Sequence, residues 1–152
     1  MNVLTTQFSL ETRSLDIYLA GCKGPHCENC HNPESWDFNK GSRYAPEKFY
    51  HTIREKVENF PDLISRFMVL GGEPMDHPEN LLYSLTWMLS RFDRPVWLFT
   101  GKQLSQVPVS VRRHCDYLKC GRYEENLRGE KEQYGVKLAS TNQHIFKKGV
   151  DF

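Results

Sequence analysis

Short apolar runs that end at a glycine alternate with longer stretches in which apolar residues return every three or four positions. The runs Leu15–Ala20, Phe67–Leu70 and Pro95–Thr100 predict buried strands, because a glycine follows each of them. The spacing of apolar residues predicts amphipathic helices from Pro46 to Phe60 and after Pro78. The chain therefore begins as a series of strand, loop and helix units.

The second half continues this order with shorter elements. We expect a short helix over Val109–His114, a strand over Asp116–Lys119 and a last strand around Ile145–Phe146. The stretch from Glu124 to Gly135 is polar and only loosely periodic, and its charges suit ion pairs on a solvated face. Repeated strand and helix units favour an α/β fold with mostly parallel strands. A closed eight-unit barrel needs about 250 residues, so we expect a partial, open barrel.

Composition limits the class of protein. The chain has 152 residues, which fits a single domain over residues 1–152, and 39% apolar with 26% charged residues fits a globular core. The sequence has 20 Lys and Arg residues and 19 Asp and Glu residues, so it lacks the excess positive charge of a nucleic-acid binder. No basic and apolar leader and no run of 18 apolar residues is present. We expect a cytoplasmic protein with no membrane partner.

Three of the five cysteines crowd into one glycine- and proline-containing loop, at Cys22, Cys27 and Cys30. Thiolates this close repel one another unless a cation holds them, and zinc and iron-sulfur clusters are the usual holders. His26 or His31 would complete a tetrahedral zinc site. A 4Fe-4S cluster on three thiolates would instead keep one iron open for a ligand. A set of three unliganded thiols is the remaining alternative.

The cysteine triplet after one strand, with Gly71-Gly72-Glu73-Pro74 after the next, resembles the radical S-adenosylmethionine (radical SAM) enzymes. The stretch from Cys30 to Asp37 is similar to the segment that follows the cluster in activases of glycyl radical enzymes. Val96–Gly101, Ser140–Gln143 and the chain length resemble the activating component of the anaerobic (class III) ribonucleotide reductase. One departure is that four residues separate the first two cysteines, where the family commonly has three.

The resemblance implies a shortened radical SAM core that acts as an oxidoreductase. Its three cysteines would hold a 4Fe-4S cluster that cleaves S-adenosylmethionine to a 5'-deoxyadenosyl radical, which would generate a glycyl radical on the large catalytic subunit of the anaerobic reductase. A flavodoxin-type or other low-potential protein would donate the electron. The expected cofactor-binding residues are Gly71, Gly72, Glu73, Pro74, Thr100, His31 and Asn32.

Several of these residues also have simpler interpretations. Gly71 and Gly72 suit a tight turn, and Thr100 either bonds the cofactor or only ends its strand. Asp76 and His77 are interpreted as turn and helix-entry residues. Cys115 and Cys120 are interpreted as ordinary thiols, which in one strand would point to opposite faces.

Two alternative functions follow from the same loop. The chain would be a zinc-binding interaction module without catalysis, or a radical SAM enzyme that acts on another glycyl radical enzyme or a small molecule. Colour and sulfide content distinguish zinc from iron and sulfur. The sequence leaves the target open.

Overall fold

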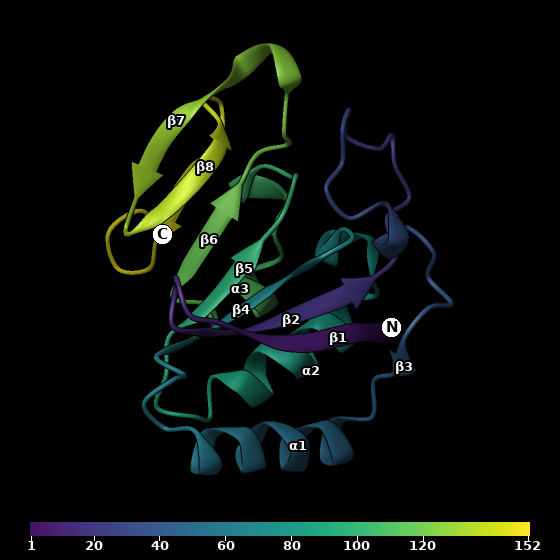
Figure 1. The fold of residues 1–152 in the computed structure, drawn as a ribbon, viewed down its shortest axis with the longest axis vertical. Helices are drawn as coiled ribbons and strands as arrows, with labels where there is room; N and C mark the ends of the chain where they lie inside the picture. The colour runs from purple at the N-terminus through teal and green to yellow at the C-terminus, as the bar shows by residue number, and fades with distance from the viewer.

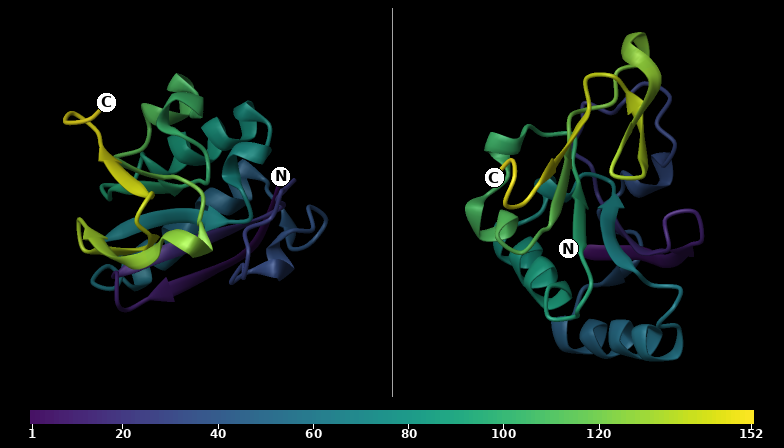
Figure 2. Two further views of the ribbon diagram at one scale, coloured as in Figure 1. Left: turned by 90° about the horizontal axis from the view of Figure 1, so that it is seen from above. Right: turned by 90° about the vertical axis from the view of Figure 1, so that its left-hand side faces the viewer.

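The computed structural model describes residues 1–152, which form a seven-stranded sheet with helices on one face and a two-stranded hairpin on the other (Figures 1 and 2). In spatial order the strands are β3 (Ser42–Arg43), β1 (Asn2–Ser9), β2 (Ser14–Ala20), β4 (Arg66–Gly71), β5 (Val96–Phe99), β6 (Tyr117–Cys120) and β9 (His144–Lys147). The four central strands β2, β4, β5 and β6 are parallel, and the outer pairings are antiparallel. The sheet is open at β3 and β9, and the partial barrel stays a prediction.

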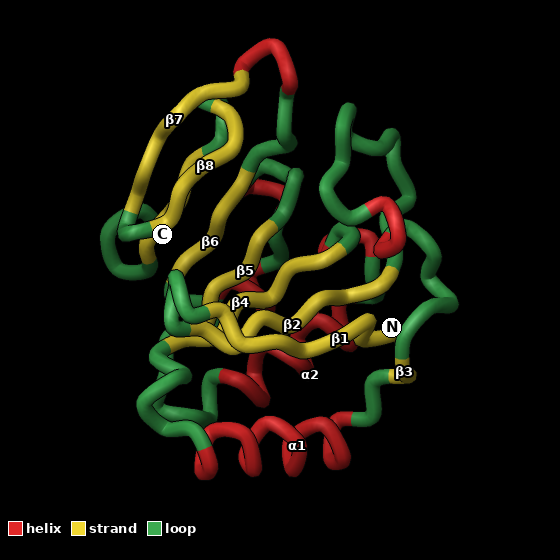
Figure 3. Tube along the Cα trace, in the orientation of Figure 1, coloured by secondary structure: helices red, strands yellow, loops and turns green.

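The helices lie where the apolar spacing predicts them. They are α1 (Pro46–Asn59), α2 (Glu79–Leu89) and α3 (Val109–Arg112), with the short 3-10 turns η1 (Pro33–Ser35), η2 (Pro74–Asp76), η3 (Leu104–Gln106) and η4 (Glu125–Leu127) (Figure 3). Alternate residues of the parallel strands, such as Leu15, Val69 and Leu98, are fully buried against Ile53 of α1 and Leu85 of α2. No helix is both long and apolar enough to cross a membrane.

A hairpin that the sequence pattern does not reveal covers the opposite face of the sheet. Its strands are β7 (Arg128–Gln133) and β8 (Val136–Ser140), within and after the stretch interpreted as a solvated face. Val136 and Leu138 pack against Met68, Trp97 and Ile145 in a second apolar cluster. The charges of this stretch form one ion pair, between Glu125 and Arg128, at 3.9 Å on an exposed surface. The hairpin is not evident in the sequence because β7 is polar and the apolar residues of the hairpin lie mainly in β8.

The two cysteines outside the loop are core residues. Cys115 and Cys120 are both buried in the helix-side cluster, so the expectation of opposite faces is wrong. The reason is that Cys115 precedes β6, which begins at Tyr117, and strand alternation does not apply to it. Burial raises the pKa of Cys120 to about 11 and raises the pKa of Cys115 further. Both thiols are therefore expected to react slowly.

Alkylation should therefore separate the five cysteines into two groups. With iodoacetamide at pH 8, the metal-free native protein is expected to take up label at Cys22, Cys27 and Cys30, because these three thiols are partly exposed and the reagent reaches them. All five cysteines should react in denaturant. Mass spectrometry of peptides gives the positions. Rapid native labelling of Cys115 or Cys120 would contradict their burial.

Candidate functional site

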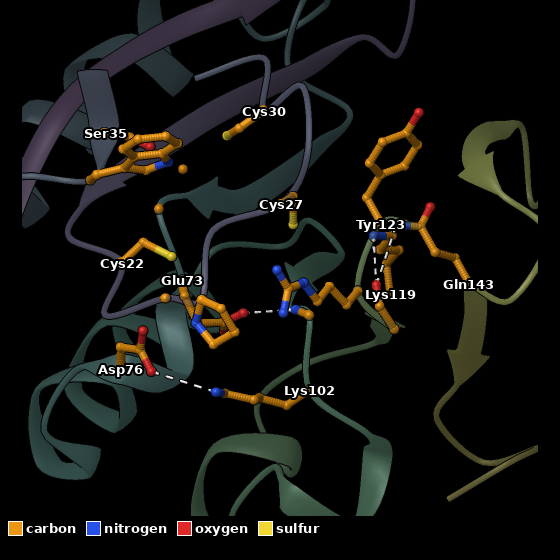
Figure 4. A pocket seen from close by; sticks show the side chains of 18 residues that line it. Cys22, Cys27, Cys30, Ser35, Glu73, Asp76, Lys102, Lys119, Tyr123 and Gln143 are labelled. Atoms are coloured by element: carbon orange, nitrogen blue, oxygen red, sulfur yellow. Dashed lines mark hydrogen bonds and ion pairs between the residues drawn. The ribbon is translucent and has the colours of Figure 1, made fainter. Parts of the chain in front are cut away.

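The carboxyl ends of the four parallel strands surround one pocket of about 220 Å³ (Figure 4). Its lining comes from the loops after β2, β4, β5 and β6 and from the turn before β9, and includes Cys22, Cys27, Cys30, Ser35, Trp36, Gly71, Gly72, Glu73, Asp76, Gly101, Lys102, Lys119, Arg122, Tyr123 and Gln143. Ligands bind at this edge of parallel sheets as a rule. The cysteine loop, the glycine pair and Gly101 each follow a parallel strand, and the structure brings all three to this pocket.

The cysteine loop is tied to the sheet at its first residues. Gly21 N donates to Ser35 O at 2.6 Å, and Cys22 N donates to Trp36 O at 3.1 Å. Lys23 N donates to Asp76 Oδ2 at 2.7 Å. All three cysteines of the loop are free, partly exposed and directed to the same pocket. The loop therefore presents three thiols on one wall.

His26 accounts for the fourth residue between the first two cysteines. Its ring is exposed and stacks on the Trp36 indole, with centroids 3.7 Å apart and planes 4° apart. His26 Nε2 donates to Cys22 O at 3.0 Å, and the Arg122 guanidinium donates to His26 O at 2.5 Å. The longer loop is thus held from both sides of the pocket. Trp36 also lines the pocket.

The glycine pair allows close packing of backbones. Gly71 has φ +121°, and a Cβ there would meet the backbone of Leu19. A Cβ on Gly72 would meet the carbonyl oxygen of Gly21. Gly72 N donates to Leu19 O at 2.9 Å and Glu73 N donates to Gly21 O at 2.8 Å. Both glycines line the pocket, but the space beside them is taken by the protein's own backbone.

The Glu73 carboxylate is fixed by three protein donors and is only 8% exposed. Oε1 accepts from Thr100 Oγ1 at 2.5 Å and from Met75 N at 2.9 Å, and Oε2 accepts from Gly101 N at 2.7 Å. A carboxylate has about four lone-pair sites, so Glu73 keeps capacity for one more donor from the pocket.

Three cations of the pocket went unnoticed in the sequence. Lys102 Nζ lies 3.7 Å from Asp76 Oδ1, and Lys119 and Arg122 come from β6 and the turn after it. Asp76 is therefore a pocket residue as well as a turn residue. The available signal was Lys119, a charged residue at the carboxyl end of a predicted buried strand.

Four of the expected cofactor-binding residues lie outside this pocket. Thr100 is 3% exposed, and its hydroxyl donates a hydrogen bond to the Glu73 carboxylate. Pro74 is buried at the start of η2. The backbone carbonyl oxygen of Asn32 accepts a hydrogen bond from Ser35 Oγ. His31 lines a neighbouring groove of about 440 Å³ between the cysteine loop and the hairpin, which Tyr123 joins to the pocket.

The Ser140–Gln143 stretch joins the hairpin to the pocket. Gln143 Oε1 accepts from Ala139 N at 3.0 Å, and Gln143 Nε2 donates to Gly121 O at 3.2 Å. Asn142 Nδ2 donates to Arg122 O at 2.9 Å. These amide side chains fix the turn after β6 and so fix where Arg122 and Tyr123 stand.

The donor set fits a 4Fe-4S cluster. Burial raises the pKa of the Cys22 thiol, and the nearby carboxylates of Asp76 and Glu73 raise it too, so a cation is needed to hold the thiolate. No group of three or more His, Cys, Asp or Glu side chains meets around one point where a single ion would sit. A cluster is larger, and each of its cysteine ligands binds a different iron atom.

Removal of the Glu73 carboxylate should weaken the fold as well as the pocket. Glu73→Ala leaves the donors of Thr100, Gly101 and Met75 without an acceptor, at a cost of about 1 to 3 kcal/mol of unfolding free energy. Urea denaturation measures the loss. Glu55→Ala, on the exposed face of α1, serves as the control and should shift the midpoint little. An unchanged midpoint for Glu73→Ala would contradict the fixed carboxylate.

Loss of the His26 ring should loosen the cysteine loop. His26→Ala removes a stacking contact worth about 0.5 to 1.5 kcal/mol, so we expect backbone amide exchange in residues 21–32 to rise about threefold to tenfold. Hydrogen exchange with mass spectrometry measures it in the metal-free protein. His51→Ala, on the exposed side of α1, should leave this loop unchanged, and His26→Phe should retain most of the protection.

The comparisons with known proteins support the cluster. A family model described as a 4Fe-4S single cluster domain matches residues 12–146, which include every strand of the parallel core and the whole cysteine loop. Comparison with curated proteins and with solved structures gives no match. Since the model covers most of the sequence, the chain belongs to the 4Fe-4S single cluster domain family.

Proposed function

We propose that this protein is a radical SAM activase that generates a glycyl radical on the large subunit of an anaerobic ribonucleotide reductase. The observation that carries the proposal is that three loop cysteines and the Glu73 carboxylate line the same pocket. The family match adds that the chain is an iron-sulfur protein. This match favours an iron-sulfur protein over a zinc-binding interaction module.

The residues of the pocket have distinct tasks in this proposal. Cys22, Cys27 and Cys30 hold three irons of the cluster, so one iron stays open to S-adenosylmethionine. Glu73 accepts a hydrogen bond from the ammonium group of that ligand, and Thr100 and Gly101 hold the carboxylate in place. When bound, the reduced cluster supplies the electron that splits S-adenosylmethionine into methionine and a 5'-deoxyadenosyl radical, which takes hydrogen from a glycine Cα.

A protein substrate suits the pocket, because a groove adjoins it at the carboxyl ends of the parallel strands. Tyr123 belongs both to the pocket and to the adjoining groove, whose walls are the cysteine loop and the hairpin. A peptide segment lying in that groove would reach the pocket and exclude water from it. A glycine-containing segment fits this route because it needs no room for a side chain. The second candidate, a small-molecule substrate, would use the pocket alone.

The test begins with the cluster. Anaerobically purified protein should be brown, with iron and sulfide in nearly equal amounts, and Cys22→Ala, Cys27→Ala and Cys30→Ala should each lose the cluster and the cleavage of S-adenosylmethionine. Cys115→Ala and Cys120→Ala are matched controls and should keep the full iron content. A site variant that retains cluster and cleavage would remove that cysteine from the ligand set.

The second stage identifies the substrate. With the large reductase subunit under reducing, anaerobic conditions, we expect a glycyl radical in the electron paramagnetic resonance (EPR) spectrum. Deuterium on the partner's glycine Cα should appear in 5'-deoxyadenosine, and replacement of that glycine by alanine should abolish both signals. Transfer of deuterium from a small molecule, with none from the glycine, would refute the activase function and support the small-molecule alternative.

A further inference from the structure

Lys119 extends from β6 into the cysteine pocket on the face of the sheet opposite the helices (Figure 4). The strand register places it between Phe99 of β5 and Ile145 of β9. Its neighbours on the strand, Leu118 and Cys120, point to the helix-side core. A mostly buried lysine between apolar side chains is uncommon unless something negative compensates for its charge.

The protein itself gives this ammonium little compensation. Its one hydrogen bond is to Gly121 O, at 3.3 Å, although an ammonium has three donors. None of the ion pairs of the chain includes Lys119. The carboxylates of the pocket are already engaged, Asp76 by Lys102 and Glu73 by its three donors.

The proposed 4Fe-4S cluster with its three thiolates would supply the negative charge that Lys119 lacks among the protein groups. Three thiolates outweigh the positive charge of a 4Fe-4S core, and reduction adds one more negative charge. Net charge around such a cluster is one of the factors that set its reduction potential. A cation in the same partly buried pocket acts through a lower dielectric than water, so its effect on the cluster is large.

We propose that Lys119 supplies the positive charge that offsets the cluster-bound thiolates and makes the cluster easier to reduce. The inference rests on the proposed ligands Cys22, Cys27 and Cys30. Burial lowers the pKa of Lys119 to about 8, so the protein part of the pocket disfavours its charge. Because Lys119 and the three loop cysteines line the same pocket, the ammonium group would lie near the cluster and offset the charge of its thiolates.

The test compares variants that differ in charge at this one place. Lys119→Met removes the charge with little change in length, and Lys119→Arg retains it. Lys137→Met makes the same charge change at an exposed position of β8. Each variant is purified anaerobically, its iron content is determined, and its cluster is titrated by EPR in the absence of S-adenosylmethionine.

We expect full iron content in all variants and a lower midpoint potential for Lys119→Met alone. Loss of the cluster from Lys119→Met but not from Lys119→Arg would also support charge compensation. An unchanged potential in Lys119→Met, with or without weaker binding of S-adenosylmethionine, would overturn the proposal, as would equal cluster loss in both Lys119 variants. A wild-type protein without a cluster would instead refute the cysteine site itself.

Discussion

The Glu73 carboxylate joins the segments from which the pocket is built. Its backbone N–H holds the start of the cysteine loop at Gly21, and its side chain accepts from Thr100 and Gly101 at the end of β5. A buried carboxylate is stable only when its oxygens have donors, so these segments must stay together. Any ligand bound here meets a group whose position is set by the fold.

The glycines beside Glu73 make this arrangement possible. The cysteine loop approaches β4 so closely that a side chain on Gly72 would meet the carbonyl oxygen of Gly21. The two glycines before Glu73 therefore satisfy a packing requirement of the backbone. The tight-turn interpretation of the pair agrees with this close packing, and the ligand interpretation stays a prediction.

Periodicity predicted the parallel strands and their helices because their burial follows regular spacing, as in Leu15, Ile17 and Leu19 of β2. It missed β1, whose exposure is irregular, and the hairpin, where β7 alternates charged and polar residues without an apolar face. The site was predictable where chemistry is concentrated in the sequence, as in the cysteine loop. Lys119, Arg122 and Asp76 were not, since only the fold brings isolated charges together.

Opposite charges line the two sides of the pocket. Thiols and carboxylates come from the loops after β2 and β4. Lys102 comes from the loop after β5, Lys119 from β6 and Arg122 from the turn after β6. Strand order therefore places an anionic wall opposite a cationic one. In the proposed function, this layout favours a zwitterionic amino-acid group with its ammonium toward Glu73 and its carboxylate toward the lysines. The same order places the cations where they face the thiols, so the electrostatic layout of the pocket follows from the order of the strands.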